Sequence, residues 1–201
     1  MTAKTLACLC VSISLPLLTA STFFDLDEVP PAFLDSGEAP WNFESIVDLP
    51  ISVEDCWSII TSDDAWQFWH PEVSIVEGVV NGVGGMRTIE FDDWLFSLFA
   101  FGPVQFEETF DVWKDTGDVR EYAFYFSAST RPEWFAYYAG REEFICESIN
   151  GGSRFTRRVA FDPGPVAQSL SLIAVPRLKL IFEVNCPKRL LNSIYRGDLP
   201  T

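Results

Sequence analysis

The sequence predicts an α+β fold, in which a curved seven-stranded antiparallel sheet grips a long C-terminal helix and two short helices follow the first strand. Three observations lead to this prediction. Segments that alternate apolar and polar residues recur between residues 73 and 161, with strong turn sequences at 115–118 and 150–152. Two short helical patterns precede them, and a long one follows at 166–196. A sheet of this length curls, so a helix on its concave side leaves space between the two.

The first elements are a strand and two capped helices. Residues 43–49 alternate and end at a proline, which predicts a strand. Ser52 is a good N-cap for a helix over 53–61. Asp63 or Asp64 is expected to cap a second helix, which Pro71 ends.

Six strands and the long helix complete the domain. The alternating segments predict strands at 73–80, 86–91, 104–114, 119–127, 134–149 and 153–161, and the loop at 81–85 suits a hairpin. The helical pattern at 166–196 contains Pro176 and Pro187, and a kink or break is expected at each.

The 201 residues are expected to form one domain, at 43–201, behind two N-terminal segments. Residues 1–20 combine Lys4, a short apolar run and small residues at 19–21, which predicts a signal peptide or apolar N-terminal segment. The run is too short for a comfortable membrane span. The signal-like pattern predicts secretion. The alternative is a cytoplasmic location, which is favoured by the odd cysteine count and by the lack of a glycosylation acceptor. Residues 21–42 form an acidic, proline-containing linker.

Charge and composition exclude several classes of function. A net charge of −15 repels phosphate backbones, so no nucleic-acid partner is expected. The five cysteines are expected to be reduced, because no Cys-x-x-Cys occurs and three of them lie in the domain. With a single histidine, His70, a zinc site is not predicted, whereas a carboxylate-only metal site stays open. No cofactor is expected, since the glycines at 82–85 precede a strand instead of a helix.

The stretch from 49 to 91 resembles a known family. The residues at 49–57, the Trp-x-Pro turn within 66–73, and Gly78, Gly82, Gly84 and Arg87 are similar to those of the START-like (SRPBCC, helix-grip) superfamily, of the polyketide cyclase/dehydrase or lipid-transport type. The resemblance implies a cavity between sheet and helix, and carriers, cyclases, dehydratases and sensors alike use this fold. The aromatic insert at 92–103 and Pro176 depart from the family pattern, which suggests a gate specific to this chain.

Strand parity predicts which side chains face the cavity, because alternate residues share a face. Four charged residues fall on otherwise apolar faces: Arg87, Glu108, Glu142 and Arg157. Two internal salt bridges or a slipped register would explain them, and a bulge near Gly140 would change part of the register. Alternatively, Glu108, Glu142 and Arg157 are catalytic. The candidate ligand-binding residues are Arg87, Phe91, Phe106, Phe110, Tyr122, Phe124, Phe126, Tyr138 and Phe155. Val112 shares the inward parity of Phe110, and His70 is expected to cap a helix or lie exposed.

Three functions from different classes follow. The first is binding of a hydrophobic small molecule such as a lipid, terpenoid or polyketide, which the 18 phenylalanines and 7 tryptophans favour. The second is a cofactor-independent cyclase, dehydratase or isomerase that acts on such a molecule. The third is a protein-interaction module without a cavity, and its partner is not predicted.

Overall fold

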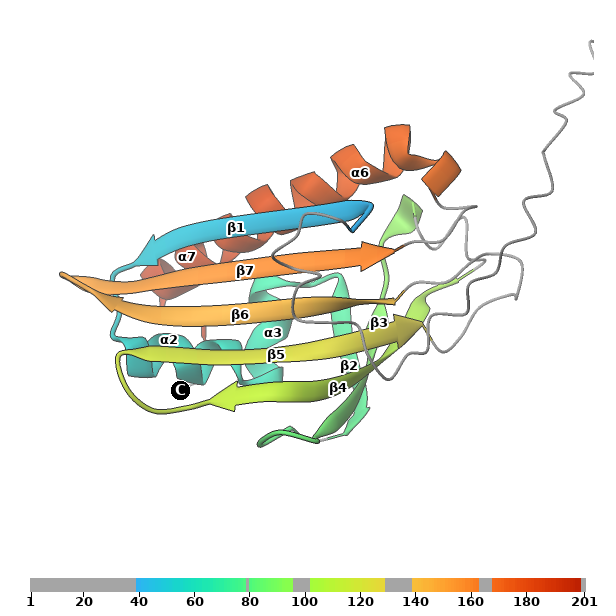
Figure 1. Cartoon of the computed structure of the whole chain (residues 1–201). Coiled ribbons are helices and arrows are strands. Elements are labelled where there is room, and N and C mark those ends of the chain that lie inside the picture. The colour runs from blue at the N-terminus through green and yellow to red at the C-terminus, as the bar shows by residue number, and fades with distance from the viewer. Residues whose placement is uncertain (1–38, 79, 96–101, 129–138, 163–167, 200–201) are drawn as a thin grey trace, which may run out of the picture.

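The computed structural model describes residues 39–78, 80–95, 102–128, 139–162 and 168–199, and it has the predicted architecture. One sheet of seven antiparallel strands, in the order β1-β7-β6-β5-β4-β3-β2, curls around the helices, which lie on its far side in Figure 1. The strands are β1 (Trp41–Leu49), β2 (Val73–Gly78), β3 (Met86–Phe91), β4 (Val104–Lys114), β5 (Val119–Ala128), β6 (Ala139–Ile149) and β7 (Gly152–Asp162). The N-terminal segments predicted at 1–20 and in most of 21–42 lie outside the described residues.

The first strand begins earlier than predicted, within the expected linker. Trp41 pairs with Phe161 of β7, and the two rings meet edge to face with their centroids 5.2 Å apart. The indole nitrogen of Trp41 also donates a hydrogen bond to the Ser171 hydroxyl at 3.1 Å. These contacts hold the start of β1 against the C-terminal helix.

Each of the two short helices begins at a serine. Helix α2 (Val53–Ile60) has Ser52 as its N-cap, as predicted, and its hydroxyl accepts a hydrogen bond from the Asp55 amide at 3.0 Å. Helix α3 (Asp63–Trp69) is capped by Ser62, so the prediction of Asp63 or Asp64 is wrong. The two aspartates instead occupy the first turn, where their charges stabilise the amino end of the helix.

The C-terminal helical run is continuous from 171 to 196, so of the predicted kink or break at each proline the break is absent. Helix α6 (Ser171–Lys179) leads into the π-helical segment η2 (Leu180–Asn185) and then helix α7 (Cys186–Arg196). Pro176 removes a hydrogen bond to the carbonyl of Leu172, an exposed residue that water can reach. The π-helical turn directly before Pro187 accommodates the second missing donor.

The two short helices fill one part of the concave face of the sheet with aromatic rings. Tyr122 of β5 stacks on Phe144 of β6 with centroids 4.6 Å apart, and Trp57 packs edge to face on Tyr122. The indole of Trp66 and the hydroxyl of Tyr122 both donate to the carbonyl of Ile60, at 2.7 and 2.9 Å. This region is a packed core, and any cavity must lie elsewhere along the sheet.

Two cysteines in this core form a disulfide between Cys56 of α2 and Cys146 of β6. The prediction that all cysteines are reduced is therefore wrong for this pair. Residues 90 positions apart meet because α2 crosses the sheet above β6, which spacing in the sequence cannot reveal. The remaining cysteine of the described chain, Cys186, is free and buried.

In the described parts of β3 to β7, the predicted inward faces hold except at one position. A bulge between Phe110 and Val112 turns Val112 outward, so the inward parity predicted for it is wrong. Trp113 takes its place and packs on Trp57, with centroids 5.4 Å apart. Near Gly140 the pairing of β5 with β6 is regular, so the bulge considered there is absent.

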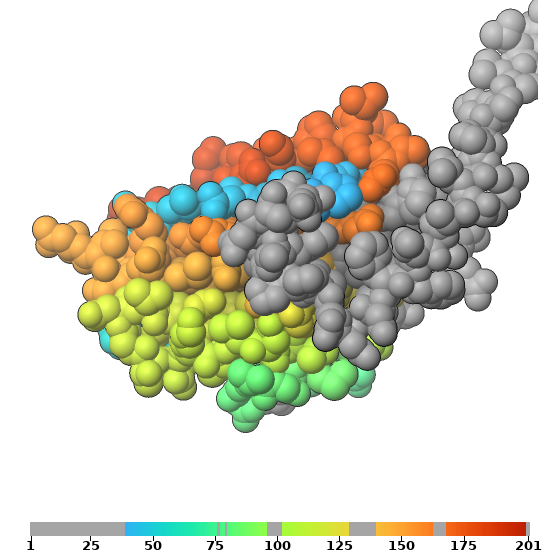
Figure 2. Space-filling view, in the orientation of Figure 1, coloured from blue at the N-terminus to red at the C-terminus, as the bar shows by residue number. Residues whose placement is uncertain are grey.

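The outer face of the sheet is polar. Figure 2 shows this face, on which β1, β7, β6, β5 and β4 form adjacent bands. Ion pairs cross it between strands, and Arg158 of β7 bonds Glu44 of β1 at 2.9 Å and Glu143 of β6 at 3.2 Å. Among the described helices, none combines the length and apolarity needed to cross a bilayer.

Candidate functional site

A cavity of about 70 Å³ lies between the other part of the concave sheet and the C-terminal helix. Its walls are mostly apolar, and four polar or charged side chains reach it. The lining residues are Trp66, His70, Val73, Ile89, Phe91, Val104, Phe106, Glu108, Phe126, Glu142, Arg157, Val159, Phe161, Leu178 and Phe182. A cavity of this composition suits an apolar ligand that carries a small polar group.

The apolar wall is assembled from neighbouring strands and closed by the helix. Phe106 of β4 and Phe126 of β5 meet edge to face with centroids 5.6 Å apart. Phe126 in turn contacts Phe161 of β7, at 6.0 Å. A Cβ at Gly140 would collide with the Phe161 Cβ and come within 2.5 Å of the Ala160 carbonyl oxygen and 2.7 Å of the Phe126 ring, so only glycine permits this packing. Phe182 of the π-helical segment covers the cavity from the helix side.

Two buried arginine–glutamate pairs stand side by side on the concave face. Arg87 of β3 pairs with Glu108 of β4, and its Nε and Nη2 atoms lie 2.7 and 2.6 Å from one carboxylate oxygen. Its Nη1 atom donates to Asp63 at 3.0 Å, and its guanidinium lies over the Trp66 ring at 4.4 Å. The Nε and Nη1 atoms of Arg87 thus have carboxylate acceptors, whereas Nη2 is buried close to Glu108 without a hydrogen bond to any described residue.

The second pair joins Arg157 of β7 to Glu142 of β6 through the Nε atom of the arginine. Arg157 lies over the Phe182 ring at 4.5 Å and is 2% exposed. Its Nη1 atom is buried and has no hydrogen-bond partner among the described residues. A buried guanidinium with an unused donor is costly, and a ligand oxygen would satisfy it.

Burial changes the proton affinity of both carboxylates. Loss of water raises the pKa of Glu108 to about 7, because the effect of burial and of nearby Glu142 exceeds the opposing effect of Arg87. Burial also raises the pKa of Glu142, against the charge of Arg157. At neutral pH Glu108 therefore exists in both protonation states, which suits general acid–base chemistry.

The structure divides the predicted site residues into three sets. Those that line the cavity are Glu108, Glu142, Arg157, Phe91, Phe106 and Phe126. Those buried away from it are Arg87, Phe110, Tyr122, Phe124 and Phe155, of which the aromatic members pack in the core below the short helices. Tyr138 and the insert residues Phe96, Phe99 and Phe101 lie outside the described residues. The charged residues pair as the salt-bridge interpretation predicted.

His70 is the residue whose position the sequence left most open. It is the C-cap of α3, as predicted, but its side chain is buried, so the exposed alternative is wrong. Burial and the nearby charge of Arg157 lower its pKa to about 4, which keeps the imidazole neutral. The ring lies between Trp66 and Phe182 and borders the cavity.

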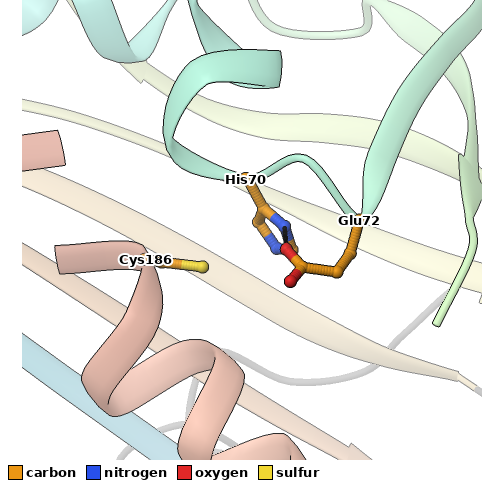
Figure 3. Close-up of side chains that lie close together, drawn as sticks. All are labelled: His70, Glu72 and Cys186. Carbon is orange, nitrogen blue, oxygen red and sulfur yellow. Dashed lines mark ion pairs between the residues drawn. The ribbon is translucent and has the colours of Figure 1, made fainter. Parts of the chain in front are cut away.

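His70 also meets two other potential metal ligands. Its Nδ1 atom lies 3.4 Å from a carboxylate oxygen of Glu72, and the thiol of Cys186 points toward both side chains (Figure 3). The donor atoms of all three residues lie within 4.8 Å of one another. Sequence reasoning missed this cluster, because Cys186 comes from the first turn of α7, more than a hundred residues away.

These features match one protein family. The family described as polyketide cyclase/dehydrase and lipid transport matches residues 40–183, and the chain belongs to this family. The match runs from the start of β1 into the π-helical segment, so it includes every residue that lines the cavity. None of the curated proteins matches the chain.

Solved structures confirm the fold. The hypothetical protein jhp0584 from Helicobacter pylori aligns with a TM-score of 0.61 at 9% identity, over 82% of this chain and 94% of its own. Protein Ms6760 from Mycobacterium smegmatis aligns with a TM-score of 0.56 at 12% identity, with the same coverage of both chains. DynU16, from the dynemicin biosynthetic locus, aligns with a TM-score of 0.52 at 15% identity, over 78% of this chain and 48% of its own. At these identities the likeness concerns the fold alone.

Proposed function

We propose that this protein binds a hydrophobic small molecule with a carbonyl or hydroxyl group, such as a lipid, terpenoid or polyketide, in the cavity below the C-terminal helix. One observation carries the proposal. The buried Nη1 atom of Arg157 has no partner among the described residues, although the guanidinium borders an otherwise apolar cavity. A ligand oxygen at this point would remove the penalty of the unpaired donor, while its apolar body would gain from burial.

The size of the cavity sets a condition on binding. A volume of about 70 Å³ is smaller than the roughly 150 Å³ that accept a benzene ring in an engineered protein core. The cavity is partly open, so a larger ligand either extends through the opening or widens the cavity. The side chains of Leu178 and Phe182 belong to the helix that covers the cavity, so a shift of this helix is the simplest way to make room.

Two aromatic probes of nearly the same shape test the role of Arg157. Acetophenone and ethylbenzene differ only by a carbonyl oxygen in place of two hydrogens. If the donor of Arg157 is used, the ketone binds at least as tightly as the hydrocarbon, although water solvates it better. Calorimetric titration measures both affinities. A ketone that binds much more weakly than ethylbenzene would contradict the proposed polar contact, and mass spectrometry of molecules that co-purify from the native source would then identify the natural class of ligand.

The second candidate is a cofactor-independent cyclase, dehydratase or isomerase, which the elevated pKa of Glu108 favours. In this mechanism ionised Glu108 removes a proton from the carbon next to a ligand carbonyl, and Arg157 stabilises the enolate oxygen. The proton returns from the carboxyl group, so the step is balanced without a cofactor.

Hydrogen–deuterium exchange tests that step directly. An enzyme of this type would exchange the methyl protons of acetophenone in D₂O, as followed by NMR, and Glu108→Gln would slow the exchange by roughly 100-fold. A carrier would bind the probe without exchange above the buffer rate. If neither probe binds, the interaction module becomes the better explanation.

We further propose that the protein enters the secretory pathway. Residues 1–20 support this through their signal-like pattern, and the Cys56–Cys146 disulfide supports it because disulfides persist in oxidising compartments. Alkylation of free thiols in denaturant without reducing agent, applied to protein from the native source, should leave this pair unmodified. Complete modification of both cysteines would favour the cytoplasmic alternative.

A further inference from the structure

We propose that His70, Glu72 and Cys186 form a binding site for a divalent transition-metal ion, and that Zn²⁺ is the ion this donor set fits best. The inference goes beyond the proposed binding function and does not depend on it. It rests on the convergence of an imidazole, a carboxylate and a thiol from the end of α3, the start of β2 and the first turn of α7 (Figure 3).

The geometry is close to that of a zinc site. The three donor atoms all lie within 4.8 Å of one another. The Nδ1 atom of His70 lies 3.4 Å from a carboxylate oxygen of Glu72. Ligands bound to tetrahedral zinc at about 2.0–2.3 Å lie roughly 3.5 Å apart. Small side-chain rotations are therefore enough to place one ion among the three atoms.

The unused hydrogen-bonding capacity of His70 is an independent observation. The side chain is buried, and neither ring nitrogen has a hydrogen-bond partner among the described residues. The contact with Glu72 lacks hydrogen-bond geometry. A buried imidazole normally satisfies at least one nitrogen, and coordination to a metal would do so.

The groups around the cluster offset part of the charge of a divalent ion. When the thiol of Cys186 loses its proton to solvent on binding, a thiolate and the Glu72 carboxylate face the ion. Arg157 already has Glu142 as its partner. Arg189 bonds both oxygens of Glu72 at 2.8 and 2.9 Å, so this carboxylate is shared between the arginine and the ion, and Arg189 orients it from outside.

The donor types decide which ion is bound. Thiolate and imidazole favour Zn²⁺ over Mg²⁺ or Ca²⁺, which prefer oxygen ligands. Three protein ligands leave one coordination position of a tetrahedral ion open. Because His70 also borders the cavity, the fourth ligand would be water or a group of the bound molecule.

Cobalt substitution tests the site in the full chain. The protein is purified without reducing agent, stripped of metal with a chelator and titrated with Co²⁺. We expect one equivalent to produce a sulfur-to-cobalt charge-transfer band in the near ultraviolet and intense visible bands of a tetrahedral ion, both removed by Zn²⁺. Cys186→Ser should abolish the charge-transfer band, whereas the control Cys8→Ser/Cys10→Ser should retain it. No band in the parent, or an unchanged band in Cys186→Ser, overturns the proposal.

X-ray absorption spectroscopy needs no variant, so it decides the matter even if Cys186→Ser fails to fold. For the zinc-loaded parent we expect one sulfur neighbour at about 2.3 Å and a single imidazole. A shell of oxygen and nitrogen without sulfur would show that zinc binds elsewhere and would refute the assignment.

Discussion

The two buried arginine–glutamate pairs use the same residue types on neighbouring strands, and each leaves one guanidinium nitrogen without a hydrogen bond to the described residues. They differ in where that nitrogen lies: the Nη2 atom of Arg87 stays 2.6 Å from the Glu108 carboxylate, whereas the Nη1 atom of Arg157 belongs to a residue that borders the cavity. Arg87 bonds Glu108 and Asp63 and stacks on Trp66, and it does not border the cavity. Arg157 bonds Glu142 alone, borders the cavity and keeps one buried donor free among the described residues.

This difference indicates that one sheet carries two kinds of buried ion pair: in one the arginine lies away from the cavity, and in the other it borders the cavity. The short helices bring Asp63 and the Trp66 ring onto Arg87, and so add an acceptor and a covering ring to its pairing with Glu108. The C-terminal helix brings Phe182 over Arg157, which covers the guanidinium but offers it no acceptor. We therefore expect changes at Arg87 to act mainly on stability, and changes at Arg157 to act mainly on ligand binding.

The largest expected effect comes from breaking the first pair. Arg87→Ala leaves Glu108 buried without its cation, and the free energy of unfolding at pH 8 should fall by about 3–5 kcal/mol. Urea denaturation measures this loss. The matched control, Arg87→Met with Glu108→Leu, removes both charges and should stay within about 1–2 kcal/mol of the parent. A double variant as unstable as the single one would show that the arginine acts through packing alone.

The next effect is a pH dependence that distinguishes Glu108 from an ordinary carboxylate. Its folded-state pKa of about 7 lies above the ordinary glutamate value of 4.5. The folded protein therefore binds the proton more tightly, and stability from this group is present at low pH and is lost as pH rises from about 4.5 through 7. Relative to Glu108→Gln, the parent should lose up to about 3 kcal/mol between pH 4 and pH 8, measured by urea denaturation. A constant difference across this range would mean that folding leaves the pKa of Glu108 at its ordinary value.

A smaller effect should appear in ligand binding at the second pair. Arg157→Met with Glu142→Leu removes the free donor without leaving a buried charge, so the protein should still fold. We expect its affinity for acetophenone to fall by roughly tenfold, about 1.4 kcal/mol, and its affinity for ethylbenzene to hold or rise. Equal losses for both probes would indicate a general change in the cavity instead of a lost hydrogen bond.

The smallest effect tests the third partner of Arg87. The Asp63 side chain is 42% exposed, so water screens its interaction with the guanidinium. Asp63→Asn should change the free energy of unfolding by less than about 1 kcal/mol, as measured by thermal denaturation. A loss as large as that of Arg87→Ala would show that Asp63, instead of Glu108, is the main partner that stabilises Arg87.

Strand parity predicted much of the site because alternation is a local property of each strand. It placed Glu108, Glu142 and Arg157 on the inward faces, where the structure has them. Parity could not show which inward-facing residues the short helices cover and which ones border the cavity. Phe124 and Phe126 share one face of β5, yet only Phe126 borders the cavity, because the short helices cover the other end.

By itself, the sequence determined the element order, the inward faces and the serine cap of the first helix, since these depend on neighbours within a few residues. Only the tertiary structure decided the contacts between distant segments: the disulfide, the contact of Arg87 with Asp63, the cavity under Phe182, and the meeting of Cys186 with His70 and Glu72. These contacts depend on where α2, α3 and the C-terminal helix settle on the curled sheet. That position minimises exposed apolar surface over the whole chain, and no local pattern encodes it.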